Sequence, residues 1–128
     1  MQQRLILIVD DDEAVRDSLR FSLAIEGFAV RAFANGRQLL AEMAVLDGDC
    51  LVVDQHMPDM TGLDLISALR ARNVTAPAIL ITSRPDPGLR DRAAAAGVLI
   101  VEKPLLDFTL VDSVRRSLAG PPGQHIHP

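Results

Sequence analysis

The chain alternates between short apolar runs and longer stretches in which apolar residues recur every three or four positions. The runs have the length of β-strands and lie at residues 5–9, 29–33, 50–53, 78–81 and 98–101. A short run that is apolar on both faces is typical of a strand in a parallel sheet that is covered on both sides. The pattern therefore predicts five strands.

The stretches between these runs predict amphipathic helices. In the first stretch, Val15, Leu19 and Leu23 share one face before Gly27 ends the helix. Residues 84–88 are rich in proline and glycine, and we expect them to form a loop. The other helices are predicted from Asn35 as a cap followed by Leu39, Leu40 and Met43, from Leu63, Ile66 and Leu69, from the alanine-rich residues 89–96, and from Leu110, Val111, Val114 and Leu118.

The strict alternation of strand and helix defines the predicted fold class. It implies an α/β, doubly wound (βα)5 domain, with a five-stranded parallel sheet, right-handed crossovers and helices on both faces. The 128 residues suffice for one domain, which we place at residues 1–119. Residues 120–128 are rich in proline and glycine, and we expect a disordered tail there.

Composition excludes some classes of function. A net charge of −4 argues against direct nucleic-acid binding, which normally needs a basic face. No apolar run approaches the roughly 20 residues that a membrane-spanning helix needs. Cys50 is the only cysteine, so no internal disulfide can form and we expect a cytoplasmic location.

Four of the predicted strands end in a polar side chain that could take part in chemistry. Asp10 and Asp11 follow the first strand, Asp54 the third, Thr82 the fourth and Lys103 the fifth. The carboxyl ends of parallel strands lie along one edge of the sheet, which is where ligands bind in open α/β sheets. We therefore expect these residues to form one site.

The residue types at this edge favour phosphoryl transfer. Three carboxylates repel one another unless a cation is present, and Lys103, the only lysine among 13 basic residues, supplies one positive charge. Ligands that are all oxygen suit Mg²⁺, which keeps several waters and accepts a phosphate. An aspartate can take up phosphate as an acyl phosphate while a metal and a lysine neutralise its oxygens. Taken alone, each residue could also be an ordinary helix-start acid, strand end or turn.

Four motifs stand at the ends of these strands. They are Val9-Asp10-Asp11, Asp54-Gln55-His56-Met57-Pro58-Asp59-Met60-Thr61-Gly62, Ile81-Thr82-Ser83 and Glu102-Lys103-Pro104. Together they resemble the receiver domain of bacterial two-component response regulators. The resemblance covers about residues 5–118, and the second and fourth motifs are most similar to those of receivers of the nitrogen-fixation regulator type. It implies a flavodoxin-like sheet with the strand order 2-1-3-4-5.

The resemblance implies a role for each matching residue. Asp54 would be the phosphoacceptor, and Thr82 and Lys103 would bind the phosphoryl group. Such a domain is a phosphoprotein that assists its own phosphorylation and dephosphorylation and is not a classical enzyme. The ligands of Mg²⁺ would be Asp10 (through water), Asp11, Asp54 and the backbone carbonyl of His56.

The resemblance also implies partners. The phosphoryl donor would be a sensor histidine kinase or a histidine phosphotransfer protein. A downstream protein would bind the face formed by the fourth helix, fifth strand and fifth helix, and a phosphorylation-dependent homodimer would be compatible with that face. The side chains of His56 and Arg84 are expected to tune the lifetime of the acyl phosphate. No effector domain follows Ala119, so the chain is either a stand-alone receiver or part of a larger protein.

Three positions depart from the usual receiver pattern. Ile100 stands where these families carry Tyr or Phe, Leu105 stands where Phe is common, and the stretch from Gly97 to Lys103 is one residue short. Isoleucine has no ring to swing and its β-branch restricts χ1. We therefore expect phosphorylation to be read through the loop that begins with Ser83 and Arg84 and through the helix after it.

Other functions remain as alternatives. Asp10-Asp11-Asp12 after a strand fits the Asp-x-Asp signature of a haloacid-dehalogenase-type phosphatase, in which Asp10 would be the nucleophile and Asp12 the acid. A nucleotide or flavin domain of the same fold lacks support, because no glycine-rich loop follows the first strand. A receiver-like scaffold that signals without phosphorylation is the third alternative, and the complete set of site residues argues against it.

Overall fold

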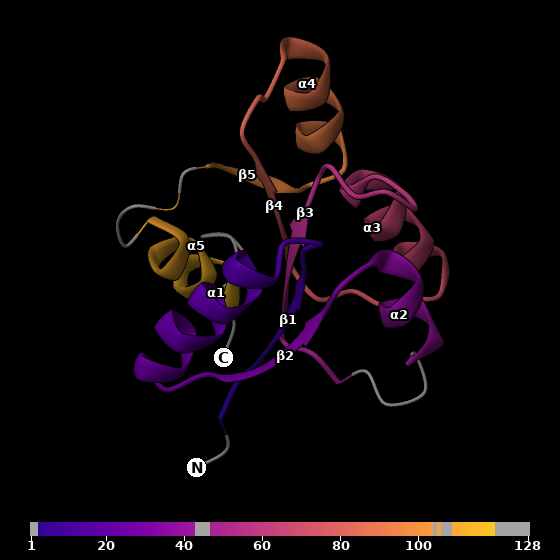
Figure 1. The fold of residues 1–128 in the computed structure, drawn as a ribbon. Coiled ribbons are helices and arrows are strands. Elements are labelled where there is room, and N and C mark those ends of the chain that lie inside the picture. The colour runs from indigo at the N-terminus through magenta and orange to yellow at the C-terminus, as the bar shows by residue number, and fades with distance from the viewer. Residues whose placement is uncertain (1–2, 43–46, 104, 106–108, 120–128) are drawn as a thin grey trace, which may run out of the picture.

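The computed structural model describes residues 3–42, 47–103, 105 and 109–119. They form a five-stranded parallel sheet in the order β2-β1-β3-β4-β5 (Figure 1). The strands are β1 (Leu5–Val9), β2 (Ala29–Phe33), β3 (Cys50–Asp54), β4 (Ala78–Thr82) and β5 (Leu99–Glu102). The helices are α1 (Glu13–Ile25), α2 (Gly36–Ala41), α3 (Gly62–Ala71), α4 (Pro87–Ala95) and α5 (Thr109–Ala119). The predicted fold class and strand order are confirmed.

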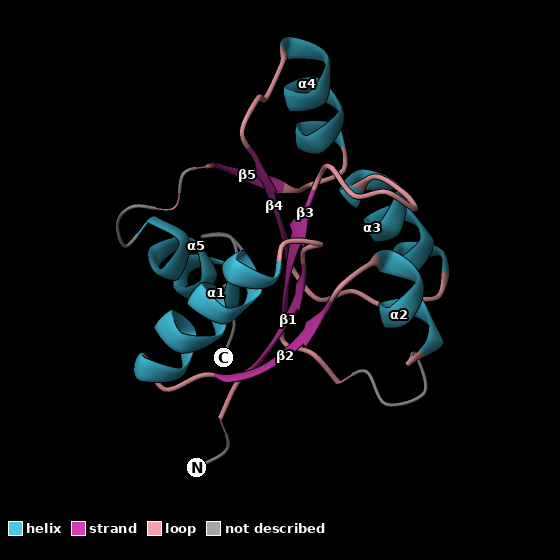
Figure 2. Cartoon of the chain, in the orientation of Figure 1, coloured by secondary structure: helices cyan, strands magenta, loops and turns pink. Residues whose placement is uncertain are grey.

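Helices cover both faces of the sheet, as Figure 2 shows. On one face, Leu19 and Leu23 of α1 and Val114 of α5 pack with alternate residues of the strands. On the other face, Leu65 of α3 and Leu89 of α4 belong to a second buried cluster that also includes α2. Because β1, β3 and β4 are buried on both sides, their sequences are apolar except for Asp54 and Thr82 at the ends of β3 and β4, which explains the apolar runs in the sequence.

Polar side chains fix where four of the helices begin. Asp12 accepts hydrogen bonds from the backbone N–H groups of Ala14 and Val15 at the start of α1. Side chains in the same position cap α2, α3 and α4, and each satisfies a backbone donor that the first helical turn leaves free. These residues are Asn35, which the sequence predicted as a cap, Thr61 and Asp86.

The expected loop at residues 84–88 is shorter than the sequence suggested. Pro87 and Gly88 belong to the first turn of α4, so the prediction of a loop through Gly88 was wrong at its end. Asp86 accepts a hydrogen bond of 2.7 Å from the N–H of Leu89, and proline suits the first helical position because it has no N–H to satisfy. Only Leu89 and Ala93 of α4 are buried, so this helix rests on a narrow contact.

Other boundaries moved by one or two residues. Asp54 is the last residue of β3 rather than the residue after it. The fifth strand is shifted by one residue at both ends, from the predicted 98–101 to Leu99–Glu102. Met43 and the predicted tail at 120–128 lie outside the described residues. Within the described ranges, no helix has both the length and the apolar character that a membrane span requires.

We predict that Gly62 cannot be replaced by alanine without loss of stability. A Cβ at Gly62 would lie 2.6 Å from the backbone oxygen of Asp54 and 2.6 Å from Leu80 Cδ1, and the backbone at the end of β3 cannot yield easily. Gly62→Ala should lower the free energy of unfolding by about 1–3 kcal/mol, the usual cost of overpacking. Urea denaturation measures this difference.

Gly36→Ala is the matched control, because Gly36 also begins a helix. Its Cβ would meet the Sδ of Met60 at 2.7 Å, and this contact is with a flexible side chain that can move aside. The control should therefore cost clearly less than Gly62→Ala. Equal losses in the two variants would contradict the close approach at Asp54.

Candidate functional site

Three carboxylates meet at the carboxyl edge of the sheet. Oxygens of Asp10, Asp11 and Asp54 all lie within 4.8 Å of one another. Asp10 and Asp11 follow β1, whereas Asp54 ends the neighbouring strand β3. Asp10 is 1% exposed and Asp54 4% exposed, while Asp11 is on the surface. The cluster therefore has two buried members and one that faces solvent.

Backbone and side-chain bonds hold Asp10 in the sheet edge. Its N–H donates to the carbonyl of Phe33 at 3.1 Å, and its own carbonyl accepts a bond of 2.8 Å from Arg16 Nη1. Oδ1 accepts a bond of 2.9 Å from the N–H of Asp12. Oδ2 is buried and has no hydrogen-bond partner among the described residues. The polar contact of this oxygen is instead an ion pair with Lys103.

Lys103 brings a positive charge between the two buried carboxylates. Its Nζ lies 3.3 Å from Asp10 Oδ2 and 3.3 Å from Asp54 Oδ1. Its backbone N–H donates to the carbonyl of Thr82 at 2.9 Å, which fixes the lysine next to the end of β4. A single ammonium group therefore forms ion pairs with two carboxylates. Because one positive charge faces two negative charges, neither carboxylate is fully neutralised.

The protonation of these groups reflects their mutual field. Burial raises the pKa of Asp54, the charge of Asp10 raises it further, and Lys103 opposes both. For Lys103, burial disfavours the charged form, yet the charges of Asp10 and Asp54 outweigh it, so its pKa is raised. The site thus stabilises the charged form of Lys103 and disfavours the charged form of Asp54.

Thr82 lies at the end of β4 beside this cluster. Its side chain is fully buried, and its Oγ1 accepts a hydrogen bond of 3.2 Å from the N–H of Arg84. The Nε2 of His56 lies 3.4 Å from the same oxygen. The side chains of His56, Ser83 and Arg84 are exposed. The hydroxyl thus connects the loop after β3 with the loop after β4.

Gln55, which no sequence pattern singles out, holds the loop after β3. Gln55 is 6% exposed, its carbonyl accepts the N–H of Gly62 at 3.0 Å, and its Oε1 accepts the N–H of Leu63 at 3.0 Å. Asp59 reaches α2, where its Oδ2 accepts the N–H of Arg37 at 3.0 Å. These bonds fix the backbone that carries Asp54.

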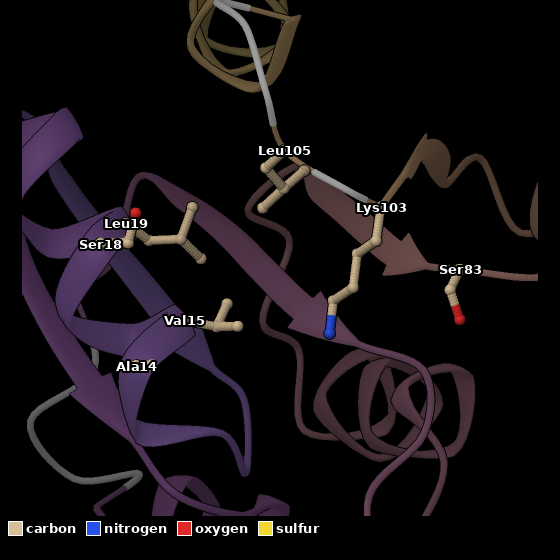
Figure 3. A pocket seen from close by; sticks show the side chains of 7 residues that line it. All are labelled: Ala14, Val15, Ser18, Leu19, Ser83, Lys103 and Leu105. Atoms are coloured by element: carbon tan, nitrogen blue, oxygen red, sulfur yellow. The ribbon is translucent and has the colours of Figure 1, made fainter.

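An open groove of about 430 Å³ lies between Lys103 and α1 (Figure 3). Figure 3 shows Val15 and Leu19 of α1 facing Leu105 and Lys103 across it. Ala14, Ser18 and Ser83 complete the lining. The groove is mostly apolar and ends at the lysine that contacts Asp54, so a molecule that approaches Asp54 from this side meets α1 first.

The donor set fits a hard divalent cation. Each ligand atom in the cluster is a carboxylate oxygen, and histidine nitrogen and cysteine sulfur are absent from the described group. Asp10 Oδ2 is buried without a hydrogen bond, and Lys103 offsets only one of the three negative charges. Oxygen ligands with excess negative charge are the setting in which Mg²⁺ binds proteins.

The structure places the predicted residues in two groups. It brings Asp10, Asp11, Asp54 and Lys103 together, with Thr82 and His56 beside them. Ile100 does not belong to this edge: it is half-buried against the cluster under α3 and α4 and pairs with Leu80. Sequence reasoning missed Arg16 and Gln55, whose contacts depend on loop geometry that no residue pattern signals.

Comparison with known proteins identifies the class of this fold and site. Residues 6–115 match the family described as the response regulator receiver domain. The chain belongs to this family, whose members are the phosphorylatable domains of two-component response regulators. Membership favours this function over the phosphatase alternative.

Two curated relatives are similar to this chain over most of its length. The C4-dicarboxylate transport transcriptional regulatory protein DctR of Rhodobacter capsulatus is 40% identical over 120 residues, which is 91% of this chain and 61% of that protein. The transcriptional regulatory protein FixJ of Rhizobium meliloti is 35% identical over 91% of this chain and 58% of its own length. The chain thus spans about three-fifths of the length of these curated relatives.

Solved structures are similar in fold. The structure titled FixJ-N matches with a TM-score of 0.81 and 36% identity over 94% of this chain and 98% of that one. Chemotaxis protein CheY4 of Vibrio cholerae matches with a TM-score of 0.84 and 27% identity over 91% of this chain and 99% of its own. The predicted resemblance to receivers of the nitrogen-fixation type is confirmed.

We predict that Asp54→Asn stabilises the metal-free protein at neutral pH. The pKa of Asp54 is raised above its ordinary value of 3.8, so the folded state binds this proton more tightly than the unfolded state does. The stability that this group contributes is therefore fully present below the unfolded pKa and is lost as pH rises through the folded pKa. The side-chain amide of Asp54→Asn does not ionise, so the variant does not lose this stability as pH rises.

Thermal unfolding with chelator at several pH values measures the effect. The midpoint of Asp54→Asn should exceed that of wild type near pH 7, and the gap should close as the pH falls below 3.8. Asp17→Asn, which removes an exposed charge from α1, is the control and should show no such closing gap. A variant less stable than wild type at pH 7 would contradict the electrostatic argument.

Proposed function

We propose that Asp54 accepts a phosphoryl group with Mg²⁺ present, and that this chain relays the modification to a partner. The observation that carries the proposal is the bridging position of Lys103, whose Nζ lies 3.3 Å from both Asp10 and Asp54. An ammonium group in this position can move from a carboxylate to the oxygens of an incoming phosphate. The ligands of the metal would be Asp10, Asp11, Asp54 and the backbone carbonyl of His56.

The chemistry is a displacement at phosphorus. A carboxylate oxygen of Asp54 forms a bond to the phosphorus while the bond from phosphorus to the leaving nitrogen or oxygen of the donor breaks. The electron pair of the broken bond leaves with the donor. Lys103 and the Thr82 hydroxyl would bind phosphoryl oxygens, and the bound cation would neutralise their developing charge. The acyl phosphate is later hydrolysed by water, and the chain assists both steps through these groups.

Asp54 suits the role of nucleophile better than Asp10 does. Asp10 Oδ1 is bonded to the N–H of Asp12, and Oδ2 is fully buried beside Lys103. Asp12, the acid that a dehalogenase-type phosphatase needs, has its Oδ1 bonded to the N–H groups that begin α1. Because the side chain of Asp12 caps α1, Asp12 is poorly suited to act as a catalytic acid.

The phosphoryl donor would be a sensor histidine kinase or a histidine phosphotransfer protein, acting in the cytoplasm. To reach Asp54, such a protein must cover the surface next to the carboxyl edge of the sheet. The apolar groove along α1 opens on that edge and would be covered in the encounter. Residues 1–119 would act as one receiver domain, alone or as part of a longer regulator like the relatives it matches.

The downstream partner would bind the face of α4, β5 and α5, which a second copy of the phosphorylated chain could also use. Leu99 of β5 is a large apolar residue that is 44% exposed on this edge strand. Arg90 of α4 and Glu102 of β5, which belong to the same three elements, form an exposed ion pair of 3.1 Å. A surface that combines an exposed apolar residue with charged groups is suited to a reversible contact.

We predict that acetyl phosphate and Mg²⁺ add one phosphoryl group to the chain and that Asp54→Asn abolishes the addition. The carboxylate of Asp54 contacts Lys103 at 3.3 Å and lies at the carboxyl edge of the sheet beside Asp10 and Asp11. Intact mass spectrometry measures the product. A mass gain that persists in Asp54→Asn but vanishes in Asp10→Asn would support the phosphatase alternative instead.

Metal binding provides the control for this experiment. Mg²⁺ affinity should be lost in Asp11→Ala and weakened in Asp10→Ala, because each variant removes a carboxylate from the cluster. In wild type, Mg²⁺ at about 100 times its dissociation constant should raise the free energy of unfolding by about 2.7 kcal/mol. Unchanged affinity in Asp11→Ala would show that the ligand set is wrong.

We predict that phosphorylation is read mainly by residues 83–96. The loop after β4 contains Arg84, whose N–H donates to the hydroxyl of Thr82. Helix α4, which follows this loop, buries only Leu89 and Ala93. A shift of Thr82 should therefore change the protection of these amides, whereas half-buried Ile100 stays packed against its core cluster. Hydrogen exchange with and without beryllofluoride, a phosphoryl mimic, measures it.

Ile100→Ala distinguishes the two possible readouts. Protection changes centred on 83–96 should persist in this variant, because the aliphatic side chain is not the moving part. Changes that centre on Ile100 and disappear in Ile100→Ala would instead make this residue the switch.

A further inference from the structure

The hydroxyl of Thr82 is held from two sides by groups of different loops. The N–H of Arg84 donates to Oγ1 at 3.2 Å from the loop after β4, and His56 Nε2 lies 3.4 Å from Oγ1 in the loop after β3. Thr82 is 0% exposed, whereas His56 is on the surface. The imidazole thus covers the buried hydroxyl at the position that faces solvent.

The donors and acceptors around Oγ1 determine what the hydroxyl can offer to a ligand. A threonine hydroxyl has a single proton to donate and can accept with its two lone pairs. Arg84 already occupies a lone pair, so the proton of Oγ1 is free to be donated to Nε2 when the histidine carries its own proton on Nδ1. In that arrangement the proton of Thr82 points at His56 and is not available to a phosphoryl oxygen.

We propose that His56 is a positioning residue that holds the Thr82 hydroxyl in the resting arrangement and competes with the phosphoryl group for its proton. The proposal rests on Asp54 being the phosphoacceptor, since only then does Thr82 have a phosphoryl oxygen to bind. Before phosphorylation, the N–H of Arg84 donates to Thr82 Oγ1, and the hydroxyl of Thr82 donates to His56 Nε2. A phosphoryl group that accepts the proton of Thr82 must break the second of these hydrogen bonds.

This competition gives His56 a defined sign of effect. Without the imidazole acceptor, the hydroxyl proton of Thr82 has no hydrogen bond to His56. The phosphoryl group or its mimic then binds without breaking that hydrogen bond. The bond is long at 3.4 Å and faces solvent, so it is a weak one. We expect its loss to tighten beryllofluoride binding about two- to fivefold, which corresponds to the weak end of the net contribution of a hydrogen bond.

The test compares wild type with His56→Ala and His56→Phe in the full chain. Alanine removes both the acceptor and the bulk of the ring, whereas phenylalanine removes the acceptor and keeps a ring of similar size. Beryllofluoride is titrated at saturating Mg²⁺ and followed by the backbone amide signals of residues 82–84. Mg²⁺ affinity is measured separately without beryllofluoride, because the backbone carbonyl of residue 56 is retained in both variants.

Similar tightening of beryllofluoride binding in both variants, with Mg²⁺ affinity unchanged, supports the proposal. Tightening in His56→Ala alone would show that the ring acts by its bulk, and a change of Mg²⁺ affinity would show that the loop itself had moved; either result overturns it. Equal affinities in all three proteins also overturn it. Failure of wild type to bind beryllofluoride at all would instead refute the proposed function.

The tautomer of His56 is a second, independent readout. The ¹⁵N chemical shifts of the imidazole, recorded in the resting protein at a pH where the ring is neutral, should show the proton on Nδ1 and an acceptor Nε2. On addition of beryllofluoride and Mg²⁺ this preference should weaken, because Thr82 withdraws its proton. A resting protein with the proton on Nε2 contradicts the proposal, since Thr82 would then have no acceptor in His56.

Discussion

The site depends on one ammonium group that two buried carboxylates share. Lys103 Nζ contacts Asp10 and Asp54 at the same distance of 3.3 Å, while both carboxylates are almost fully withdrawn from solvent. Buried charges of like sign are unfavourable, and a single cation between them reduces the repulsion without removing it. The remaining negative charge is what makes this edge of the sheet receptive to a metal ion.

The rest of the fold keeps this arrangement from relaxing. Two isolated carboxylates would reduce their repulsion by turning toward water. Here the strands that carry Asp10 and Asp54 are buried on both faces, which prevents such a movement. Gly62 approaches the backbone of Asp54 closely, and Gln55 ties the same loop to the start of α3. The packing of the sheet therefore holds the aspartates near each other although their charges oppose it.

Much of this could be predicted from the sequence, because the relevant signals were local. Apolar runs gave the strands, and Asn35 was visible as a cap because it precedes a helical pattern. Residues at strand ends share an edge in any parallel sheet, so Asp10, Asp54 and Lys103 could be grouped without coordinates. The start of α4 was misplaced because Pro87 resembles a breaker until Asp86 is known to cap it.

The contacts that could not be predicted from the sequence each involve a residue of a loop at this edge of the sheet. Whether Arg16 reaches the carbonyl of Asp10, or His56 reaches Thr82, depends on backbone angles and side-chain torsions that no periodicity encodes. The strand ends fix the chemistry of the site. The loops decide which resting hydrogen bonds must be exchanged when that chemistry occurs.

This division between strand ends and loops explains how a modification at one residue can be felt elsewhere. A phosphoryl group on Asp54 would remove one carboxylate from the shared ammonium and add new oxygens that compete for Lys103 and Thr82. The strand ends cannot move far, because their neighbours are packed on both faces of the sheet. The loop at Arg84 and α4 can move, so the change in hydrogen bonding is transferred to a loop and a helix of which only Leu89 and Ala93 are buried.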